Sequence, residues 1–312
     1  MVFEIGLTEP DDFSNEALKL LRGIGGVSLY APESQTLKDF IKNKHALFVR
    51  LQHYWGYEQL HNAQNLRFLC TPTTGLTHID MDYAAAAKIN VISLKGETAF
   101  LKTISATAEH SFGLALALLR RYGHSFLRRD SFAWDRDKFK GYEMKHMRAG
   151  IIGMGRIGAR LSGYLHAFGA ETYYYDIREN VENPHNAHRV DSLCALVDAA
   201  DIVFLCASYE KENVHMMDAN ILCRMKGKYF VNTSRGELVD EEELLSLIRK
   251  GFFAGVALDV VEGEPGATRA MAFSTLSSRH NLLITPHIGG ATYSSMWATE
   301  EFIAEKLIAA LR

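Results

Sequence analysis

Short apolar runs alternate with amphipathic segments along the first hundred residues of the chain. The runs are rich in β-branched and aromatic residues and predict strands, while the apolar spacing between them predicts helices. One helix is expected over 15–21, with Ser14 as its N-cap. This alternation predicts a parallel sheet covered by helices on both faces. The expected strands are 3–7, 27–30, 46–49, 66–70 and 91–94.

The pattern changes after Thr103, where a leucine-rich segment predicts one long helix. The helix starts in Ser/Thr-rich sequence and ends in Arg120 and Arg121, just before Gly123. We expect it to cross between two domains. The polar segment 126–147, which contains Trp134, is too long for a simple connection. We expect that segment to wrap the surface or to contact a second subunit.

Strands and helices alternate again from residue 149 to the end of the chain. A helix with acidic residues at its start is expected over 240–249, and Gly251 should end it. The last segment, 294–311, predicts an amphipathic helix that returns to the first domain. The expected strands are 151–152, 172–175, 202–205, 229–232, 255–258 and 282–284.

The stretch 149–176 has the residue order of a dinucleotide-binding strand–helix–strand unit. Gly153 allows a tight turn after the strand, Gly155 lets the backbone approach a pyrophosphate, and Gly158 lets the helix pack closely. The helix N-terminus offers free N–H groups to the phosphates. Asp176 can accept hydrogen bonds from the adenosine ribose and would repel a 2′-phosphate, so we predict NAD as the cofactor. The alternative is an ordinary strand–helix–strand turn that binds no ligand.

Composition restricts the class of protein without identifying it. A chain of 312 residues can form two domains, and 47% hydrophobic with 23% charged residues is ordinary for a soluble protein. The net charge of −3 gives no reason to expect nucleic acid or an anionic membrane as a partner. Four cysteines lack the spacing of a metal or redox site, which favours reduced thiols, a cytoplasmic protein and no bound metal. No secretion signal or membrane-spanning run is evident, so we expect neither secretion nor insertion.

Polar residues follow three successive strands in the second half of the chain. Arg235 follows 229–232, Asp259 and Glu264 follow 255–258, and His287 follows 282–284. Each residue alone has a simple structural explanation, such as a solvated arginine or a turn-forming Glu-Pro pair. Ligands bind at the carboxyl ends of the strands in open α/β sheets. The four residues together therefore predict a functional site.

At this point the chain resembles the D-isomer-specific 2-hydroxyacid dehydrogenases over nearly its whole length. Within that family it looks most like the 3-phosphoglycerate or hydroxypyruvate branch, without a regulatory domain. The resemblance implies a doubly wound Rossmann domain for NAD (106–288) inserted into a split, flavodoxin-like substrate domain (1–105 and 289–312). The motifs that carry it are TTGLTHID (73–80), TAEHSFGLALALLRR (107–121), GIIGMGRIG (150–158), MKGKYFVNTSRGELVDEEEL (225–244), ALDVVEGEP (257–265) and TPHIGGAT (285–292).

The resemblance also implies three catalytic residues and a substrate loop. Arg235 matches the arginine that binds the substrate carboxylate, and its planar fork suits that group. His287 matches the residue that exchanges a proton with the substrate oxygen, and Glu264 would hold its imidazole in one tautomer. Backbone N–H groups at Thr74 and Gly75 would hold the same carboxylate.

Further residues are implied as cofactor contacts. Asp259 matches the residue that binds the nicotinamide carboxamide. Thr233 and Ser234 are expected along the cofactor cleft, with hydrogen bonding inside their own loop as the alternative. The other expected cofactor contacts are Gly153, Gly155, Arg156, Ile157, Gly158, Asp176 and Cys206.

Some positions depart from the family's usual pattern. Cys206 and Ser208 occupy positions where many members have histidine and proline, and we expect Cys206 to line the cofactor site without acting as a nucleophile. The stretch 94–104 is longer than usual, and Arg50 follows the third strand, where substrate-facing residues are expected. These differences concern substrate identity. Formate dehydrogenase, a relative, is disfavoured because Glu264 stands where a glutamine is expected.

We therefore predict an NAD-dependent oxidoreductase that interconverts a D-2-hydroxy acid and its 2-oxo acid, as a cytoplasmic homodimer. Arg50, Lys95 and Lys102 could bind a second anionic group of the substrate, or they are three solvated cations. The alternative function is an NAD(H)-sensing binding protein of the corepressor type on the same fold.

Overall fold

The computed structural model describes residues 2–126, 136–264, 266 and 269–312. The chain forms two compact units. Unit 1 comprises Met1–Thr103 and Ala291–Arg312, and unit 2 comprises Ile104–Gly290. Unit 2 is thus an insertion in the sequence of unit 1. The domain joins expected from the sequence were 105/106 and 288/289, and the binding role assigned to each unit stays a prediction.

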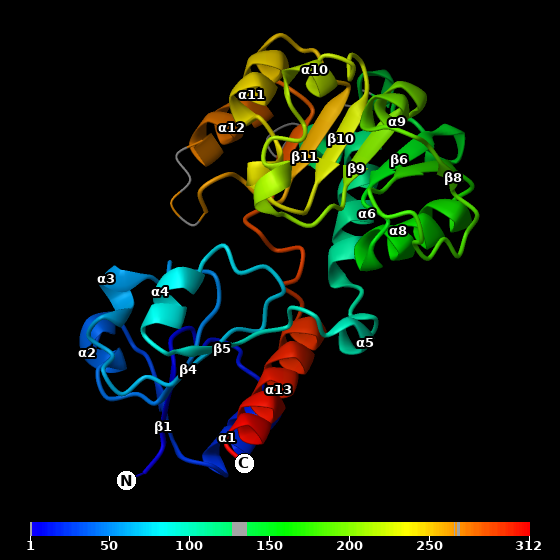
Figure 1. The fold of residues 1–312 in the computed structure, drawn as a ribbon. Coiled ribbons are helices and arrows are strands. Elements are labelled where there is room, and N and C mark those ends of the chain that lie inside the picture. Colours follow the sequence, from blue (N-terminus) through cyan, green and yellow to red (C-terminus); the bar gives the residue numbers. More distant parts are fainter. Residues whose placement is uncertain (1, 127–135, 265, 267–268) are drawn as a thin grey trace. The chain divides into compact units, whose positions relative to one another are not determined.

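A five-stranded parallel sheet forms the centre of unit 1, in the order β2-β1-β3-β4-β5 (Figure 1). This is the strand order of flavodoxin-like folds. Strand β1 pairs with β2 on one side and β3 on the other, so that Ile5 lies opposite Val27 and Ala46. All five strands were predicted to within two residues at each end. Their bounds are β1 Glu4–Leu7, β2 Gly26–Leu29, β3 Ala46–Phe48, β4 Phe68–Cys70 and β5 Asn90–Ile92.

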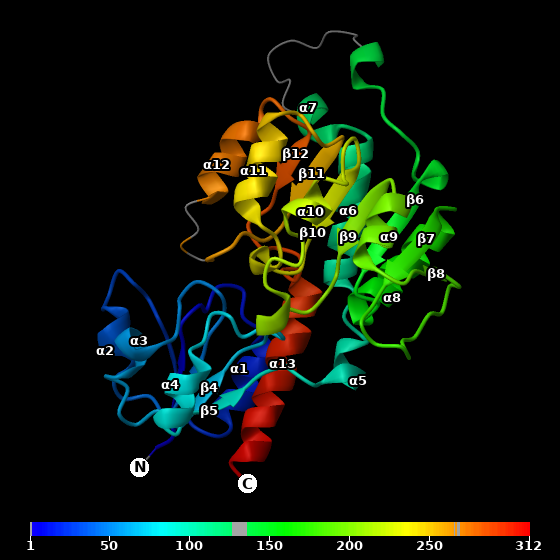
Figure 2. The ribbon, with the colours of Figure 1, turned by 45° about the horizontal axis from the view of Figure 1, so that its top comes forward.

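Helices pack on the sheet of unit 1. The hydroxyl of Ser14 accepts a hydrogen bond from the Ala17 N–H at 3.2 Å, which confirms the predicted N-cap. The C-terminal helix α13 lies beside α1 (Figures 1 and 2) and buries Ile303 and Leu307 in the core of this unit, as expected for a returning tail. The helices are α1 Asn15–Arg22, α2 Leu37–Ile41, α3 Tyr57–Leu60, α4 Met81–Ala86, α5 Thr98–Leu101 and α13 Tyr293–Ala310.

Unit 2 contains a seven-stranded parallel sheet in the order β12-β11-β10-β9-β6-β7-β8. The order reverses between β6 and β9, which is the topological switch of a Rossmann fold and confirms the predicted fold class. The strands β9 to β12 have the bounds that the sequence predicted, whereas the two-residue strand β8 was not predicted. The bounds are β6 Arg148–Ile152, β7 Glu171–Tyr175, β8 His188–Arg189, β9 Ile202–Leu205, β10 Tyr229–Asn232, β11 Gly255–Leu258 and β12 Leu282–Ile284.

Two hydrophobic cores cover the two faces of this sheet. One contains Leu118 and Leu161 from α6 and α8, and the other contains Leu196, Leu244 and Phe273 from α9, α11 and α12. The α-helices are α6 Ala106–Leu119, α7 Tyr122–Phe126, α8 Arg156–Ala167, α9 Leu193–Ala199, α10 Ala219–Leu222, α11 Glu241–Arg249 and α12 Arg269–Ser277. Short 3-10 helices are η1 Arg136–Phe139, η2 Met144–His146, η3 Lys211–Asn213 and η4 Gly236–Leu238.

The expectation that the leucine-rich helix crosses between domains is wrong. Helix α6 lies entirely in unit 2, because its apolar side chains pack against the seven-stranded sheet. It also ends earlier than predicted, at Leu119, and Arg121 follows in a left-handed conformation with φ 55°. Residues 127–135 of the long polar segment, Trp134 included, lie outside the described residues. No helix in the described parts of the chain has the length and apolar character needed to cross a bilayer.

Candidate active site

In the glycine loop after β6, two glycines leave no room for a side chain and a third has free space beside it. Gly153 has φ 90°, and a Cβ there would lie 2.8 Å from the backbone of Ala207. A Cβ on Gly158 would lie 2.3 Å from the Gly153 carbonyl oxygen. A Cβ on Gly155 would meet only the Arg178 Nη2, at 3.9 Å. The loop thus packs tightly on the sheet and leaves free space above Gly155, as a bound pyrophosphate requires.

Helix α8 begins directly after this loop. Arg156 and Ile157 are its first two residues, so the unpaired N–H groups of the first turn belong to the expected phosphate site. The Arg156 Nη1 donates to the Ile104 carbonyl oxygen at 3.5 Å. Burial, with the nearby charge of Arg160, lowers the pKa of Arg156.

Asp176 lies at the end of β7 with only 6% of its surface exposed. Its Oδ2 accepts the Met154 N–H at 2.8 Å, which ties the acid to the glycine loop. Arg178 donates from Nε to Oδ1 at 3.0 Å and from Nη2 to Oδ2 at 2.9 Å. Burial opposes the charged form, but the hydrogen bonds from Arg178 and Met154 prevail and lower the pKa of Asp176. Asp176 is therefore held as a carboxylate between the glycine loop and Arg178.

Three neighbouring strands bring the predicted catalytic residues to one edge of the sheet. Strands β10, β11 and β12 are adjacent and parallel. Arg235 follows β10, Glu264 follows β11 and His287 follows β12. Since the carboxyl ends of these strands share an edge, residues 52 positions apart in the sequence belong to one region of unit 2.

His287 and Glu264 form a close pair. The His287 Nδ1 lies 2.6 Å from the Glu264 Oε2. The second oxygen of Glu264 accepts the Val261 N–H at 2.6 Å, so both oxygens have a partner. The backbone of His287 has φ 54°, and its backbone N–H donates to the Asp259 carbonyl oxygen at 2.8 Å. A carboxylate at Nδ1 favours a proton on that nitrogen, and it directs Nε2 away from Glu264.

Asp259 holds the segment that carries this histidine. Its Oδ1 accepts the Thr285 hydroxyl at 2.6 Å and the Ile288 N–H at 2.9 Å, and its Oδ2 accepts the Gly289 N–H at 2.7 Å. The His110 Nε2, on α6, lies 3.2 Å from Oδ1. Burial would raise the pKa of Asp259, but these hydrogen bonds lower it. The sequence indicated a cofactor contact here and did not predict this support or the part of His110 in it.

Arg235 has no ion-pair partner within the described part of the chain. Its Nη1 donates to the Ser234 carbonyl oxygen at 2.6 Å. Burial lowers the pKa of Arg235, and the charges of Glu237 and Glu264 partly oppose that effect. A largely buried guanidinium without a carboxylate against it is suited to bind a carboxylate from a ligand.

The hydroxyls next to Arg235 connect separate elements. Thr233 lies 2.6 Å from the Ser111 hydroxyl on α6, and Ser234 donates to the Leu205 carbonyl oxygen at 2.9 Å. These bonds reach beyond the loop itself. Burial raises the pKa of the Cys206 thiol to about 12, which keeps it protonated and unreactive, in line with the expectation that it is no nucleophile.

In unit 1, Arg50 is bound by acidic groups of its own unit. Its guanidinium pairs with the buried carboxylate of Glu300, and its Nη1 donates to the Asp11 carbonyl oxygen at 3.1 Å. The Arg50 N–H donates to Glu9 at 3.0 Å. The predicted role of Arg50 in substrate binding stays a prediction, and this guanidinium already has a counter-ion.

Thr74 and Gly75 lie in the loop that follows β4. The Thr73 hydroxyl donates to the Gly75 carbonyl oxygen at 2.9 Å and lies 3.0 Å from the Thr71 hydroxyl. Thr71 in turn lies 3.2 Å from the Nε2 of the buried His78. Polar side chains thus support the loop whose N–H groups are expected to bind a carboxylate.

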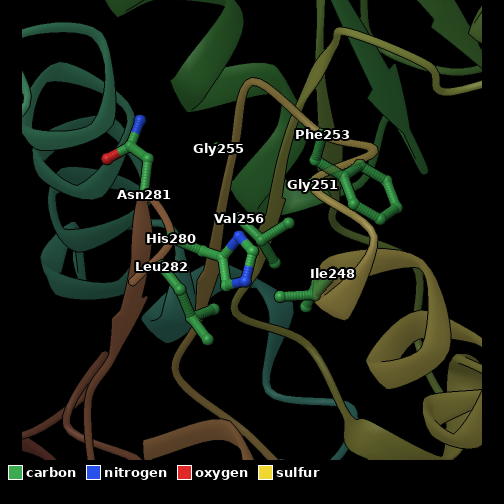
Figure 3. Close-up of a pocket in the computed structure, with 8 residues that line it drawn as sticks. All are labelled: Ile248, Gly251, Phe253, Gly255, Val256, His280, Asn281 and Leu282. Carbon is green, nitrogen blue, oxygen red and sulfur yellow. The ribbon is translucent and has the colours of Figure 1, made fainter. Parts of the chain in front are cut away.

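A small cavity of about 30 Å³ lies at the opposite edge of the unit 2 sheet. It is lined by Gly255 and Leu282, which begin β11 and β12, and by the side chains of His280, Val256 and Ile248 (Figure 3). The amino ends of parallel strands carry no ligand site in folds of this kind. This cavity has room for about one water molecule, so we assign it no function.

Comparisons with known proteins extend over nearly the whole chain. The family model described as D-isomer specific 2-hydroxyacid dehydrogenase, NAD binding domain, matches residues 112–289. A glyoxylate reductase of Thermofilum pendens is 32% identical over 290 residues, which cover 91% of this chain and 83% of that protein. A glyoxylate reductase of Pyrococcus furiosus is 32% identical over 284 residues, covering 88% and 82% of the two chains. A crystal structure of D-lactate dehydrogenase from Aquifex aeolicus, complexed with NAD and lactic acid, is 25% identical, with a TM-score of 0.82 and coverage of 99% and 95%.

Proposed function

Because the chain belongs to the D-isomer-specific 2-hydroxyacid dehydrogenase family, we propose that it interconverts a small D-2-hydroxy acid and its 2-oxo acid with His287 as acid/base. The family makes it an NAD-dependent enzyme. That finding disfavours the alternative of a sensor without activity.

The contact between His287 and Glu264 is the observation that carries the proposal. When bound, NAD supplies or accepts the hydride at C2 of the substrate. His287 gives a proton to the C2 oxygen during reduction and removes it during oxidation. Glu264 keeps the imidazole oriented through the 2.6 Å contact at Nδ1, which directs Nε2 away from Glu264.

Arg235 binds the carboxylate of the substrate in this proposal. Its guanidinium has no ion-pair partner among the described residues and can offer two parallel N–H groups. The backbone N–H groups of Thr74 and Gly75 are proposed to bind the same group. Asp259 is proposed to contact the nicotinamide carboxamide in addition to its hydrogen bonds within the protein.

The residues at the glycine loop fit NAD. A Cβ on Gly155 would meet only the Arg178 Nη2, at 3.9 Å, so the backbone there is open to a pyrophosphate, and the α8 N-terminus offers N–H groups to it. Asp176 is proposed to accept hydrogen bonds from the ribose hydroxyls. Thr233, Ser234 and Cys206 are proposed to line the same cleft. A 2′-phosphate would meet the Asp176 carboxylate, so kcat/KM should be higher with NADH than with NADPH.

We infer that the substrate is a small 2-oxo acid with one anionic group. The two relatives described above are named glyoxylate reductases. Arg50, which could bind a second anion, is paired with Glu300 in unit 1. This favours solvated or internally paired cations over a phosphate site, and it disfavours the 3-phosphoglycerate branch that the sequence suggested.

Turnover of a substrate panel tests the proposal. NADH oxidation is followed with glyoxylate, pyruvate, hydroxypyruvate and their phosphorylated or dicarboxylic counterparts, and NADH binding is measured separately by fluorescence. We expect the small monoanionic acids to give the highest kcat/KM. Binding of NADH without turnover of any 2-oxo acid would contradict the proposal.

The homodimer and the cytoplasmic location also stay predictions. Light scattering of the purified protein tests the oligomeric state. A mass equal to one chain at micromolar concentration would exclude a stable dimer.

A further inference from the structure

One buried carboxylate in unit 2 has no part in the proposed chemistry. Glu241, the first residue of α11, is only 2% exposed. Its Oε1 accepts the Glu262 N–H at 2.9 Å, and its Oε2 is buried without a hydrogen-bond partner among the residues that the structure describes. Burying a carboxylate with one partner is costly, so the protein tolerates Glu241 for some compensating effect.

The hydrogen bond of Glu241 ends on the turn that carries Glu264. Glu262, whose N–H donates this hydrogen bond, lies between Val261 and Glu264 in the segment after β11. The Val261 N–H donates to one oxygen of Glu264, and the other oxygen contacts His287. Helix α11 is thereby linked to the imidazole through one turn of backbone.

The same turn packs tightly against the chain next to Arg235. A Cβ on Gly236 would lie 2.0 Å from the Glu262 backbone nitrogen and 2.3 Å from the Val261 carbonyl carbon. The turn 261–264 is therefore confined between the Gly236 backbone and the side chain of Glu241. A shift of this turn would move Glu264 relative to His287.

We propose that Glu241 is a positioning residue for the acid/base pair: by accepting the Glu262 N–H it holds the turn that presents Glu264 to His287. This inference rests on the proposed function of that pair. Outer partners of reacting groups are typically worth about 10- to 100-fold in activity when removed from metal sites, and we expect the lower end here.

The charges around Glu241 come from several elements. Glu262 on the turn and Glu237 on η4 disfavour its ionised form, while Arg269 on α12 favours it. Glu262 itself pairs with Arg269, and the His215 Nε2 lies 3.5 Å from its Oε1. Burial is the main cause that raises the pKa of Glu241, to about 7. Both its neutral and its ionised form have an oxygen that accepts an N–H, so the hydrogen bond does not depend on one protonation state.

Two substitutions separate the acceptor from the charge. Glu241→Gln keeps an acceptor oxygen without the charge, and Glu241→Leu removes the acceptor at similar volume. We expect Glu241→Gln to retain kcat within about threefold and Glu241→Leu to lose about tenfold, with NADH affinity unchanged in both. The matched control is Glu242→Leu, the same substitution at the exposed next position of the helix. In Glu241→Leu the loss should appear in kcat and leave KM for the 2-oxo acid unchanged, because the substitution acts on the orientation of the acid/base pair.

A double-mutant cycle decides between positioning and general destabilisation. In a Glu264→Gln background, Glu241→Leu should cost less than about twofold in kcat, because the contact that it supports is already weakened. An equal loss in both backgrounds, or an equal loss for Gln and Leu at position 241, would overturn the proposal. If Glu241→Leu does not fold, Glu241→Met takes its place in the same cycle. Retained turnover of His287→Ala would instead contradict the proposed function, so the two failures are distinguishable.

Discussion

Two arginines that each follow a strand, Arg50 in unit 1 and Arg235 in unit 2, differ in whether a carboxylate of the protein pairs with them. Arg50 follows β3 in unit 1, and its guanidinium is paired with the fully buried Glu300. Arg235 follows β10 in unit 2 and has no ion pair among the described residues, and the buried Glu241 has none either. Arg50 is thus compensated by a carboxylate of its own unit, whereas Arg235 is left without one in the part of the chain that the structure describes. The difference indicates that Arg50 contributes to the stability of unit 1 and that Arg235 is suited to bind a carboxylate from a ligand.

The largest predicted effect is a loss of turnover on substitution of His287 in unit 2. His287→Ala should lower kcat by about 10²- to 10⁴-fold, because no side chain then gives a proton to the C2 oxygen or removes it. NADH affinity, measured by fluorescence titration, should not change. His280→Ala, at the opposite edge of the same sheet, is the matched control and should retain kcat. Near-normal turnover of His287→Ala would show that His287 is not the acid/base residue.

Breaking the ion pair of unit 1 should mainly affect stability. Arg50→Met leaves the Glu300 carboxylate buried without its counter-ion, and this should lower the free energy of unfolding by about 3 kcal/mol. The loss should be smaller at pH 5 than at pH 8, because burial raises the pKa of Glu300 and an unpaired Glu300 can take up a proton at the lower pH. Urea unfolding measures both.

The control for this substitution is Arg67→Met, which removes an exposed arginine just before β4. It should change the unfolding free energy by less than about 0.5 kcal/mol. A variant Arg50→Met that keeps its stability and loses kcat/KM would show that Arg50 acts on the substrate, against the comparison.

Substitution of Glu241 in unit 2, which has no ion pair among the described residues, should raise stability at high pH, whereas Arg50→Met lowers it. The pKa of Glu241 is raised from its ordinary 4.5 to about 7, so the folded state holds the extra proton between these values. The stability that this proton provides is fully present below pH 4.5 and is lost as pH rises through 7. Glu241→Gln removes the titration, and its stability relative to the wild type should increase by about 3 kcal/mol between pH 4 and pH 8. A constant difference across this range would contradict the expectation.

The smallest effect is expected from a change of shape at constant charge. Arg235→Lys keeps the positive charge and loses the bidentate fork, so kcat/KM for the 2-oxo acid should fall about tenfold. The affinity for NADH and the unfolding midpoint should stay the same, unlike those of Arg50→Met. Arg249→Lys on the exposed end of α11 is the control. A fall in stability that matches the fall in kcat/KM would mean that Arg235 is structural, like Arg50.

The parts of the fold that the sequence predicted well are those with a local signal. Strands β9, β10 and β11 are buried over their whole length and β12 at its first residue, all four are mainly apolar, and their ends were correct. Strand β8 is two exposed polar residues, His188 and Arg189, and is formed only by pairing with β7. The end of α6 depends on the left-handed Arg121, for which the residue type gives no warning.

The same distinction holds for the site. His287 and Glu264 could be found because each follows a predicted strand and matches a motif. The support of this site by Asp259, His110 and Glu241 depends on contacts between distant segments. His110 is one position in a leucine-rich helix, and Glu241 is an acid in the first turn of a helix, where acids are common. Their burial exists only once α6, α11 and the strand ends have come together.

The left-handed backbone of His287 has a consequence for selection on this enzyme. A residue with a side chain at φ 54° is held in a region that glycine enters at no cost and that asparagine tolerates well. Replacement by glycine would relieve about 1 kcal/mol of backbone strain while removing the imidazole. Directed evolution for heat resistance alone would therefore favour loss of the residue that we propose as the acid/base. A library for thermostable variants needs a turnover screen in every round to keep the histidine.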